Sequence, residues 1–433
     1  MMNSIWSDSI KIQDFHSLIG DTKTDVLIIG GGMAGILCAY FFEQADVDYI
    51  LLEKNRIGGG ITKNTTAKIT SQHGLIYHKM LKSIGINKTK MHLDANNLAL
   101  DEYRKICKYI ECDFEEKDNY IYSLDNRSAI KSELSALKKL NANAEFVSTI
   151  PLPFAIAGSI KFPKQAQFNP LKFIAGISKK ENIFEHTEVK ELAPYTAITE
   201  TGKITAKHII VATHFPFLNK HGGYFLKLYQ HRSYVIALEN APNIEGMYLE
   251  EKEDGLSFRN YKDYLIIGGG SHRTGKKGGD YEVLRKFAKE HYPNAIEKYA
   301  WATQDCMSLD GIPYIGKYGR HAEGLYVATG FNKWGMTGSM VSAMLLTDMI
   351  LGKENPYAKV FSPQRCMLNP QLLLNSITAI GNLLTPTVPR CPHMGCALKW
   401  NKIENTWECP CHGSRFQKDG TLIDTPATGD LKI

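Results

Sequence analysis

The feature that most constrains the fold of this 433-residue chain is a strand, helix and second strand close to its start. The apolar, β-branched stretch at residues 24–32, TDVLIIGGG, predicts a buried strand. Residues 33–45, MAGILCAYFFEQA, predict a helix, and residues 48–54, DYILLEK, predict a second strand. Parallel strands joined by a helix form a βαβ unit, so the sequence predicts an α/β domain.

A glycine motif lies at the first turn of this unit. Gly30, Gly32 and Gly35 fit G-x-G-x-x-G, in which glycines allow a tight bend and let backbone N–H groups approach a pyrophosphate. Glu53 follows about 20 residues later, where an acid binds a ribose 2′-hydroxyl. The alternative is a purely structural turn, but all parts of the unit agree with dinucleotide binding. A second triplet, Gly268–Gly270, lacks a following apolar helix and is interpreted as a strand end.

Two features favour FAD over NAD as the dinucleotide. The chain has one such motif, not two, and GFNKWGMTG at residues 330–338 places glycines directly before an apolar helix. A helix N-terminus aimed at a flavin ring would stabilise the negative charge that develops when the ring is reduced. The alternative is a glycine-rich turn that caps a core helix.

Cysteine and histidine pairs distinguish the C-terminal tail, which holds four of the nine cysteines. Cys391-x-His393 and Cys409-x-x-His412 each supply one thiolate and one imidazole. A Rieske [2Fe-2S] centre holds one iron with two thiolates and the other with two imidazoles, so these four residues are its predicted ligands. A Cys2His2 zinc site is the alternative. Zinc more commonly uses C-x2-4-C and H-x3-5-H pairs, and it would leave the other two cysteines of the tail unexplained.

Beyond these motifs, the chain resembles the D-amino-acid oxidase and glycine oxidase type of FAD-dependent oxidoreductase over residues 24–352. It looks most similar to bacterial members with an appended Rieske domain, through GGGITKNTTAKITSQHG, ATQDCMSLDGIPYIG and ATGFNKWGMTG. The resemblance implies an α/β, Rossmann-like FAD-binding domain, an α+β substrate domain, and a small β and loop Rieske subdomain that binds the cluster. The expected division is 1–354 for the oxidoreductase (FAD-binding parts 22–75, 150–222 and 305–354; substrate parts 76–149 and 223–304), 355–388 for a linker and 389–433 for the Rieske subdomain.

The resemblance also implies the FAD contacts. They comprise the glycine turn, the end of the second strand, the loop after it, one residue of a later strand, and the glycines before the last apolar helix. These are Gly30, Gly32, Met33, Ala34, Gly35, Glu53, Lys54, Gly60, Ile61, Thr62, Thr65, Thr66, Ala67, Lys68, Val189, Gly330, Gly335, Met336 and Thr337.

Further expectations concern the cluster loops. The Rieske resemblance implies a disulfide between Cys396 and Cys411, and it implies that the loop Thr425–Thr428, TPAT, covers a third side of the cluster. Ser414 can donate a hydrogen bond to a cluster sulfur. Phe416 stands where high-potential respiratory Rieske proteins carry a tyrosine, which predicts a lower potential here.

Enzymes of this type usually oxidise a C–N bond by hydride transfer to the flavin, so the resemblance implies an amine or amino-acid-like small-molecule substrate. The expected function is a dehydrogenase whose cluster passes electrons to an acceptor protein or a quinone. The alternatives are an oxygen-using oxidase with a structural cluster and a non-enzymatic redox sensor.

No catalytic residue is assigned from the sequence. Thr337 stands near the place where enzymes of the sarcosine oxidase type carry a lysine for the substrate carboxylate. Arg232, Arg259 and Arg273 could replace it, although each is also a common type of structural arginine. Cys306 lies in a Cys-Met context that resembles a flavin-tethering cysteine, although the favoured interpretation is a buried thiol.

Bulk properties restrict the partners. The net charge of +6 is small and scattered, without a basic run or a row of aromatic residues, so nucleic acid is not an expected partner. Neither an export signal nor an apolar run of membrane-spanning length is present, so we expect a cytoplasmic protein without a membrane span. Few strands can precede Cys391, so the short cluster subdomain is expected to dock on the flavoprotein body or on a second subunit, as in a homodimer.

Overall fold

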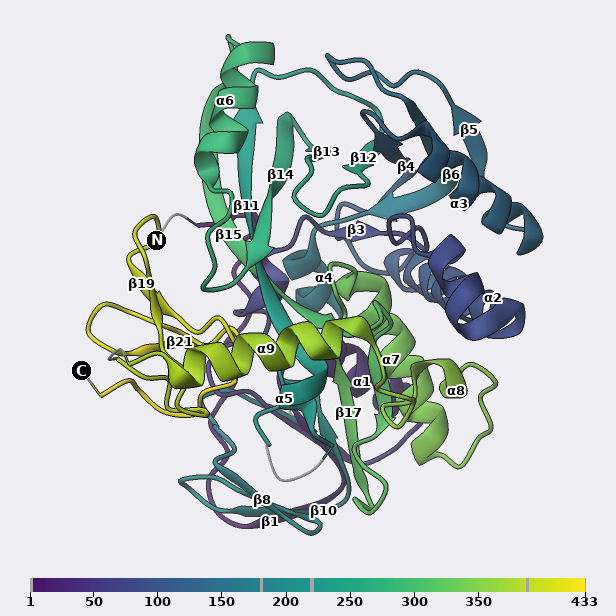
Figure 1. The fold of residues 1–433 in the computed structure, drawn as a ribbon. Coiled ribbons are helices and arrows are strands. Elements are labelled where there is room, and N and C mark those ends of the chain that lie inside the picture. The colour runs from purple at the N-terminus through teal and green to yellow at the C-terminus, as the bar shows by residue number, and fades with distance from the viewer. Residues whose placement is uncertain (1–2, 180–181, 219–221, 387–388, 433) are drawn as a thin grey trace.

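The computed structural model describes residues 3–179, 182–218, 222–386 and 389–432. Two large mixed sheets and one small sheet organise the molecule (Figure 1). The strands of the first sheet are β1 (Thr22–Ile29), β2 (Tyr49–Leu52), β7 (Ile183–Phe184), β8 (Glu191–Ala193), β9 (Thr196–Ile198), β10 (Lys203–Val211), β16 (Tyr314–Lys317) and β17 (Leu325–Thr329). Their order is β16-β17-β10-β1-β2-β7, with β9 paired to β10 and β8 paired to β9.

The predicted βαβ unit is present in this sheet. β1 runs parallel to β2, and helix α1 (Met33–Gln44) connects them. β10 and β17 extend the parallel part beside β1. Parallel strands covered on both faces are apolar throughout, and the last four residues of β1 are accordingly all buried.

The second sheet forms the floor of the expected substrate domain. Its strands are β3 (Lys68–Ile69), β4 (Glu115–Ser123), β5 (Glu145–Val147), β6 (Gly158–Gln167), β11 (Leu228–Glu239), β12 (Met247–Glu250), β13 (Ser257–Tyr261), β14 (Tyr264–Arg273) and β15 (Ile296–Ser308). The order is β15-β11-β14-β13-β12-β4-β6-β3, with β5 on β6. Because β6 pairs with β4, this part of residues 150–222 lies in the second sheet and not beside the FAD-binding strands.

Helices cover both large sheets. They are the short 3-10 helix η1 (Ile61–Asn64), α2 (Tyr77–Cys107), α3 (Arg127–Lys139), α4 (Pro170–Ile177), α5 (Tyr224–Lys227), α6 (Tyr281–His291), α7 (Gly335–Ile350), α8 (Ala358–Phe361) and α9 (Pro370–Leu384). α1 and α7 pack against each other beside the first sheet. Among the described residues, no helix combines the length and the apolar character needed to cross a membrane.

The C-terminal subdomain has a small antiparallel sheet of four short strands. These are β18 (Lys399–Asn401), β19 (Thr406–Glu408), β20 (Arg415–Phe416) and β21 (Leu422–Asp424). Figure 1 shows it at one side of the body, with α9 running from it across the front of the molecule. The expected linker at 355–388 therefore contains two helices, α8 and α9.

One sequence interpretation is wrong. Gly268–Gly270 were interpreted as a strand end, but β14 continues through them to Arg273. The reason is close packing. A Cβ on Gly269 would lie 2.6 Å from a methyl carbon of Leu256, so glycine here admits a neighbouring side chain and does not end the strand.

Candidate functional site

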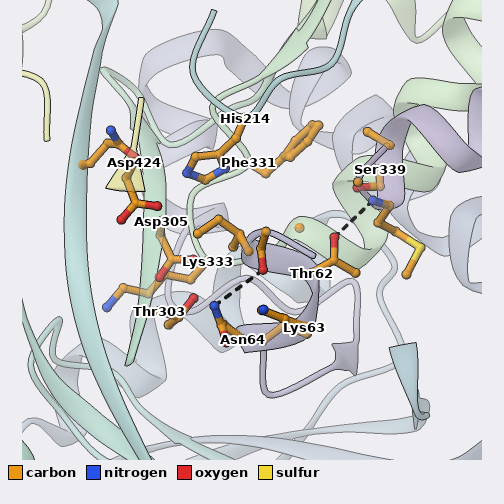
Figure 2. A pocket seen from close by; sticks show the side chains of 18 of the residues that line it. Thr62, Lys63, Asn64, His214, Thr303, Asp305, Phe331, Lys333, Ser339 and Asp424 are labelled. Atoms are coloured by element: carbon orange, nitrogen blue, oxygen red, sulfur yellow. Dashed lines mark hydrogen bonds between the residues drawn. The ribbon is translucent and has the colours of Figure 1, made fainter. Parts of the chain in front are cut away.

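One large cavity of about 740 Å³ lies between the two large sheets. Figure 2 shows side chains from several distant segments that face into it, among them Thr62, Thr303 and Asp424. Most of the predicted FAD contacts line it. These are Gly30, Gly32, Met33, Ala34, Glu53, Lys54, Gly60, Ile61, Thr62, Thr65, Thr66, Lys68, Val189, Gly335 and Met336.

The glycine turn and the second strand are shaped to accept a dinucleotide. The N-cap of α1, Gly32, has no side chain, and the Thr62 hydroxyl accepts a hydrogen bond from the Met33 N–H at 3.1 Å. The remaining backbone N–H groups of the first turn are the ones that can approach a pyrophosphate. A Cβ on Gly30 would lie 2.6 Å from the carbonyl oxygen of Ala212, so only glycine fits at this turn. One carboxylate oxygen of Glu53 accepts a hydrogen bond from the N–H of Gly31, 2.7 Å away, which fixes this acid at the cavity wall.

The expected flavin loop is held from behind by a buried arginine. The guanidinium of Arg259 donates to the carbonyls of Thr66 and Ala67 at 2.7 and 2.9 Å, and the side chain is fully buried. At the other wall, α7 begins at Gly335 without a side-chain cap or an acid in its first turn among the described residues. This helix N-terminus fits an electron-accepting ring, so the residues present are compatible with FAD.

Four predicted contacts do not line the cavity. Gly35 packs α1 onto its own strand, because a Cβ there would lie 1.9 Å from the carbonyl oxygen of Gly30. The Thr337 hydroxyl lies 3.1 Å from Nε2 of His73 and is buried behind the wall. Ala67 is fully buried, and Gly330 has a positive φ of 69° at the turn before α7. These residues support the site and do not face it.

Among the charged side chains that line the cavity, Lys333 and Asp305 were not singled out from the sequence. Lys333 donates hydrogen bonds from Nζ to the Ser271 hydroxyl at 2.7 Å and to the Glu253 carbonyl at 2.9 Å. Burial raises the pKa of Asp305 to about 6, although the positive charge of Lys333 opposes the shift. Burial also lowers the pKa of Lys333. Lys333 lies within the quoted GFNKWGMTG motif, so its position beside the glycines was the available signal.

The arginines proposed for a substrate carboxylate have other partners. Arg232 forms an ion pair with Glu404 of the cluster subdomain. Arg273 donates to the carbonyls of Pro410 and Cys411, both at 2.9 Å. Together with Arg259, they are absent from the cavity lining, so all three are structural.

Cys306 faces away from the cavity. On β15 its neighbours Asp305 and Met307 line the cavity, and side chains alternate along a strand. The Cys306 thiol lies 3.7 Å from the Thr329 hydroxyl and is 1% exposed. The structure therefore favours the buried thiol over the flavin tether.

Residues of the predicted cluster site come together in two groups within the C-terminal subdomain. Nδ1 of His393 and Nδ1 of His412 are 3.2 Å apart. The sulfur atoms of Cys396, Cys409 and Cys411 all lie within 4.8 Å of one another, and all three residues are buried. The structure holds Cys396 and Cys411 as free thiols, so their disulfide stays a prediction.

The imidazole of His412 is oriented by the body. Its Nε2 donates to the carbonyl of Phe225 at 2.9 Å, which leaves Nδ1 for the iron. The ring of Phe215 lies 6.4 and 6.2 Å from the rings of His393 and His412. The histidine side of the site therefore faces the flavoprotein body.

Polar contacts dock the cluster loops directly on the second sheet. The amide of Gln230 on β11 donates to the carbonyls of His412 and Thr425, at 2.7 and 2.9 Å. The amide of Gln304 on β15 donates to the carbonyl of Gly413 at 2.9 Å. The predicted docking on the body is thus present within the described chain.

The cluster subdomain also supplies part of the cavity wall. The lining residues from the predicted proline loop and the strand before it are Ile423, Asp424, Thr425, Ala427 and Thr428. Figure 2 places Asp424 on the same side of the cavity as Asp305. The candidate flavin and cluster sites are therefore neighbours that share one loop.

Comparisons with known proteins agree with this arrangement. A family described as FAD dependent oxidoreductase matches residues 25–349, and the Rieske [2Fe-2S] domain matches residues 377–433. The chain is 33% identical to the Rieske 2Fe-2S iron-sulfur protein YhfW of Bacillus subtilis, over 99% of this chain and 96% of that protein. It is 21% identical to gamma-glutamylputrescine oxidoreductase of Escherichia coli, over 79% of this chain and 87% of that protein.

Solved structures show the same fold for the body. Glycine oxidase from Geobacillus kaustophilus superposes with a TM-score of 0.67 at 18% identity, covering 80% of this chain and 99% of that one. L-amino acid deaminase from Proteus vulgaris superposes with a TM-score of 0.65 at 15% identity, covering 82% of this chain and all of that one.

Fold and site together define a flavin-dependent oxidoreductase with an attached iron–sulfur subdomain. The chain belongs to the DAO family of FAD dependent oxidoreductases, and it carries a C-terminal Rieske [2Fe-2S] domain. FAD and a Rieske cluster are the cofactors that these two domains imply.

Proposed function

We propose that the protein is a dehydrogenase for an amine or amino-acid-like substrate and that its Rieske cluster carries the electrons to an external acceptor. When bound, FAD accepts a hydride from the substrate, and the cluster accepts electrons one at a time. The observation that carries the proposal is the shared loop. Residues 423–428 of the cluster subdomain include five that line the flavin cavity, and the same subdomain holds the predicted cluster ligands.

Buried side chains fix the cluster subdomain on the sheet that borders the flavin cavity. Gln230 joins β11 to both the His412 loop and the Thr425 loop. Gln304 bonds to Gln230 at 3.0 Å and to the His412 loop at Gly413, and both amides are at most 1% exposed. Buried, fully bonded amides of this kind hold two parts in one geometry, which suits electron transfer over a constant distance.

The charges of the cavity suit a substrate with an amino group and a carboxylate. The Asp305 carboxyl can attract an ammonium and accept its proton, which has to leave before the C–N bond is oxidised. The positive charge of Lys333 can attract the carboxylate of the substrate. The proteins named glycine oxidase and gamma-glutamylputrescine oxidoreductase suggest glycine and gamma-glutamylputrescine as the first substrates to test.

Stopped-flow spectroscopy of the protein with both cofactors bound tests the proposal. On mixing with a substrate in the absence of oxygen, we expect the flavin absorbance to bleach first and the cluster absorbance to follow within the turnover time. The matched variant is Cys409→Ser, which should lose the cluster signal and keep the flavin phase. A cluster that stays oxidised after the flavin has been reduced, together with full-rate oxygen consumption in a separate aerobic assay, would instead establish the oxidase. Absence of flavin reduction by any amine, with a redox-dependent change of partner, would establish the sensor.

A further inference from the structure

Helix α9 has its polar side toward the protein and its apolar side toward solvent. The polar residues recur at helical spacing and face the body: Gln371, Asn375, Thr378 and Asn382. Asn375 is the one buried residue of the helix, and its side-chain oxygen accepts a hydrogen bond from Arg273 at 2.8 Å. The backbone oxygen of Asn382 accepts a hydrogen bond from the N–H of Ala397 at 3.0 Å. Polar contacts therefore fix which side of α9 faces outward.

The outward side is a continuous row of aliphatic side chains. Their exposed fractions range from 43% to 77%, and the residues are Leu373, Leu374, Ile377, Ile380, Leu383 and Leu384. A surface helix of a water-soluble domain normally has the reverse arrangement, with its apolar stripe on the core. Figure 1 shows α9 at the front of the molecule with no other element over it. A contiguous apolar patch of this kind indicates a binding surface.

The charge around α9 identifies what it binds. Between Glu354 and Glu404 the sequence contains no acidic residue and five basic ones: Lys359, Arg365, Arg390, Lys399 and Lys402. Of these, Arg365 forms an ion pair with Asp310 and is left out of the charge near α9. At the two flanks of the helix, Nζ of Lys276 lies 3.4 Å from the Thr378 hydroxyl, and Arg390 donates to the carbonyl of Leu383 at 3.2 Å. The apolar row is thus bordered by cations.

A second copy of the chain fits this surface poorly. Two copies that paired through α9 would bring the cations beside each helix together, and like charges repel. An anionic lipid surface accepts both components, because the aliphatic row enters the boundary of the acyl chains while lysine and arginine meet the head groups. We propose that α9 docks the protein on an anionic lipid surface, lying in the plane of the membrane without crossing it.

This docking would place the cluster beside the lipid. The end of α9 is bonded through Asn382 to the first ligand loop, where the side chain of Met394 is 40% exposed. An acceptor dissolved in the lipid would then lie next to the cluster loops. The docking itself rests on α9 and its flanking charges, and it holds whether or not electrons pass from flavin to cluster.

Vesicle sedimentation of the full protein with both cofactors bound tests the inference. We expect the protein to sediment with vesicles of equimolar phosphatidylcholine and phosphatidylglycerol, and to stay in solution with phosphatidylcholine alone. Added salt should weaken the binding, because it screens the charges. The triple variant Leu374→Gln, Ile377→Gln, Ile380→Gln should lower partitioning by about tenfold or more, since burial of aliphatic groups provides the binding energy.

Two controls make the result decisive. Ile19→Gln changes an aliphatic residue that is 82% exposed outside α9, and it should bind vesicles as the parent does. Lys276→Glu should weaken binding to the anionic vesicles without changing the flavin or cluster spectrum. Equal binding by the triple variant and the parent would overturn the inference. So would a parent that ignores the vesicles but forms a dimer that the triple variant cannot form.

Discussion

The flavin-binding part and the cluster subdomain are stabilised in different ways. The core of the flavin-binding part is built from aliphatic and aromatic side chains, such as Val26, Leu37 and Leu346, which are fully buried. The core of the cluster subdomain consists of Cys391, Cys396, Cys409, Cys411, Leu398, Phe416, Ala427 and Leu431. Because half of this small core is cysteine, the subdomain depends on something other than hydrophobic burial for its fold.

The cluster subdomain has two sources of stability outside its own core. One is the cluster, whose bonds to the protein become folding energy when the ligands are brought together. The other is the body, which contributes the ion pair of Arg232 and the amides of Gln230 and Gln304. The flavin-binding part needs neither support, so the two regions should respond separately to substitution.

The largest expected effect follows from removal of the cluster. Cys409→Ser should leave residues 389–432 open to rapid hydrogen exchange, because the small core loses the ligand that organises it. The body should keep its FAD and its exchange protection. Hydrogen–deuterium exchange, together with iron and flavin content per chain, measures both. Cys366→Ser removes an exposed cysteine and serves as the control. Full protection of the tail without iron would show that the subdomain is self-sufficient.

The next effect concerns the ion pair between the two regions. The side chains of Arg232 and Glu404 are 6% and 13% exposed, and although burial opposes it, the charge of Arg232 lowers the pKa of Glu404 to about 2. Arg232→Ala should destabilise the docked subdomain by about 3–5 kcal/mol, because it leaves a buried carboxylate with fewer partners. Denaturant unfolding followed through the cluster absorbance measures this loss.

An exposed ion pair provides the matched control. Arg285 pairs with Glu297 at 2.9 Å, with exposures of 35% and 28%. Arg285→Ala should cost about 1 kcal/mol or less. If the two arginine variants unfold alike, burial of the Arg232 pair is not what holds the subdomain.

A substitution in the flavin-binding part should affect FAD binding and spare the cluster. Gly35→Ala places a Cβ 1.9 Å from the Gly30 carbonyl oxygen, so α1 has to move away from β1. We expect a loss of about 2–3 kcal/mol in stability, a sharp fall in FAD content and normal iron content. Gly381→Ala on α9 meets no described atom within 4 Å and should keep both cofactors. Equal loss of iron and FAD from Gly35→Ala would mean that the two regions fold as one unit.

The smallest expected effect is a change in the pH dependence of catalysis at the shared cavity. With a pKa of about 6, Asp305 is mostly ionised above pH 6 and neutral below it, so attraction of a substrate ammonium should weaken as the pH falls through 6. The value of kcat/KM should drop below pH 6 in the parent, and Asp305→Asn should lower it about tenfold, or about 1.4 kcal/mol, at neutral pH. An inflection near pH 6 that persists in Asp305→Asn would assign the titration to another group.

Local patterns were sufficient to predict the parts of both sites that are continuous in sequence. The glycine turn and Glu53 belong to one βαβ unit, whose geometry follows from alternating strand and helix propensities. The ligand pairs Cys391-x-His393 and Cys409-x-x-His412 are likewise local, and the structure brings His393 and His412 together. The fold class and the two cofactors could therefore be predicted from short segments.

Contacts between distant segments could not be predicted in this way. Lys333 and Asp305 come from different strands and loops, and their charges act on each other only because β15 and the turn before α7 converge at the cavity. The sequence favoured a structural role for Arg232 and Arg273 but could not name their partners, since nothing near them shows that Glu404 and Pro410 lie beside them. The outward direction of the α9 leucines also depends on a distant residue, Arg273, which binds Asn375.

The sequence by itself determined the nucleotide turn, the predicted cluster ligands and the presence of two cofactor domains, because each depends on residue types at a fixed short spacing. The tertiary structure alone decided where the cluster subdomain sits. Its own core is too small to fix a position, so side chains of β11, β14 and β15 define it through ion pairs and hydrogen bonds. That placement puts the loop of residues 423–428 into the flavin cavity, and it leaves the apolar side of α9 facing outward.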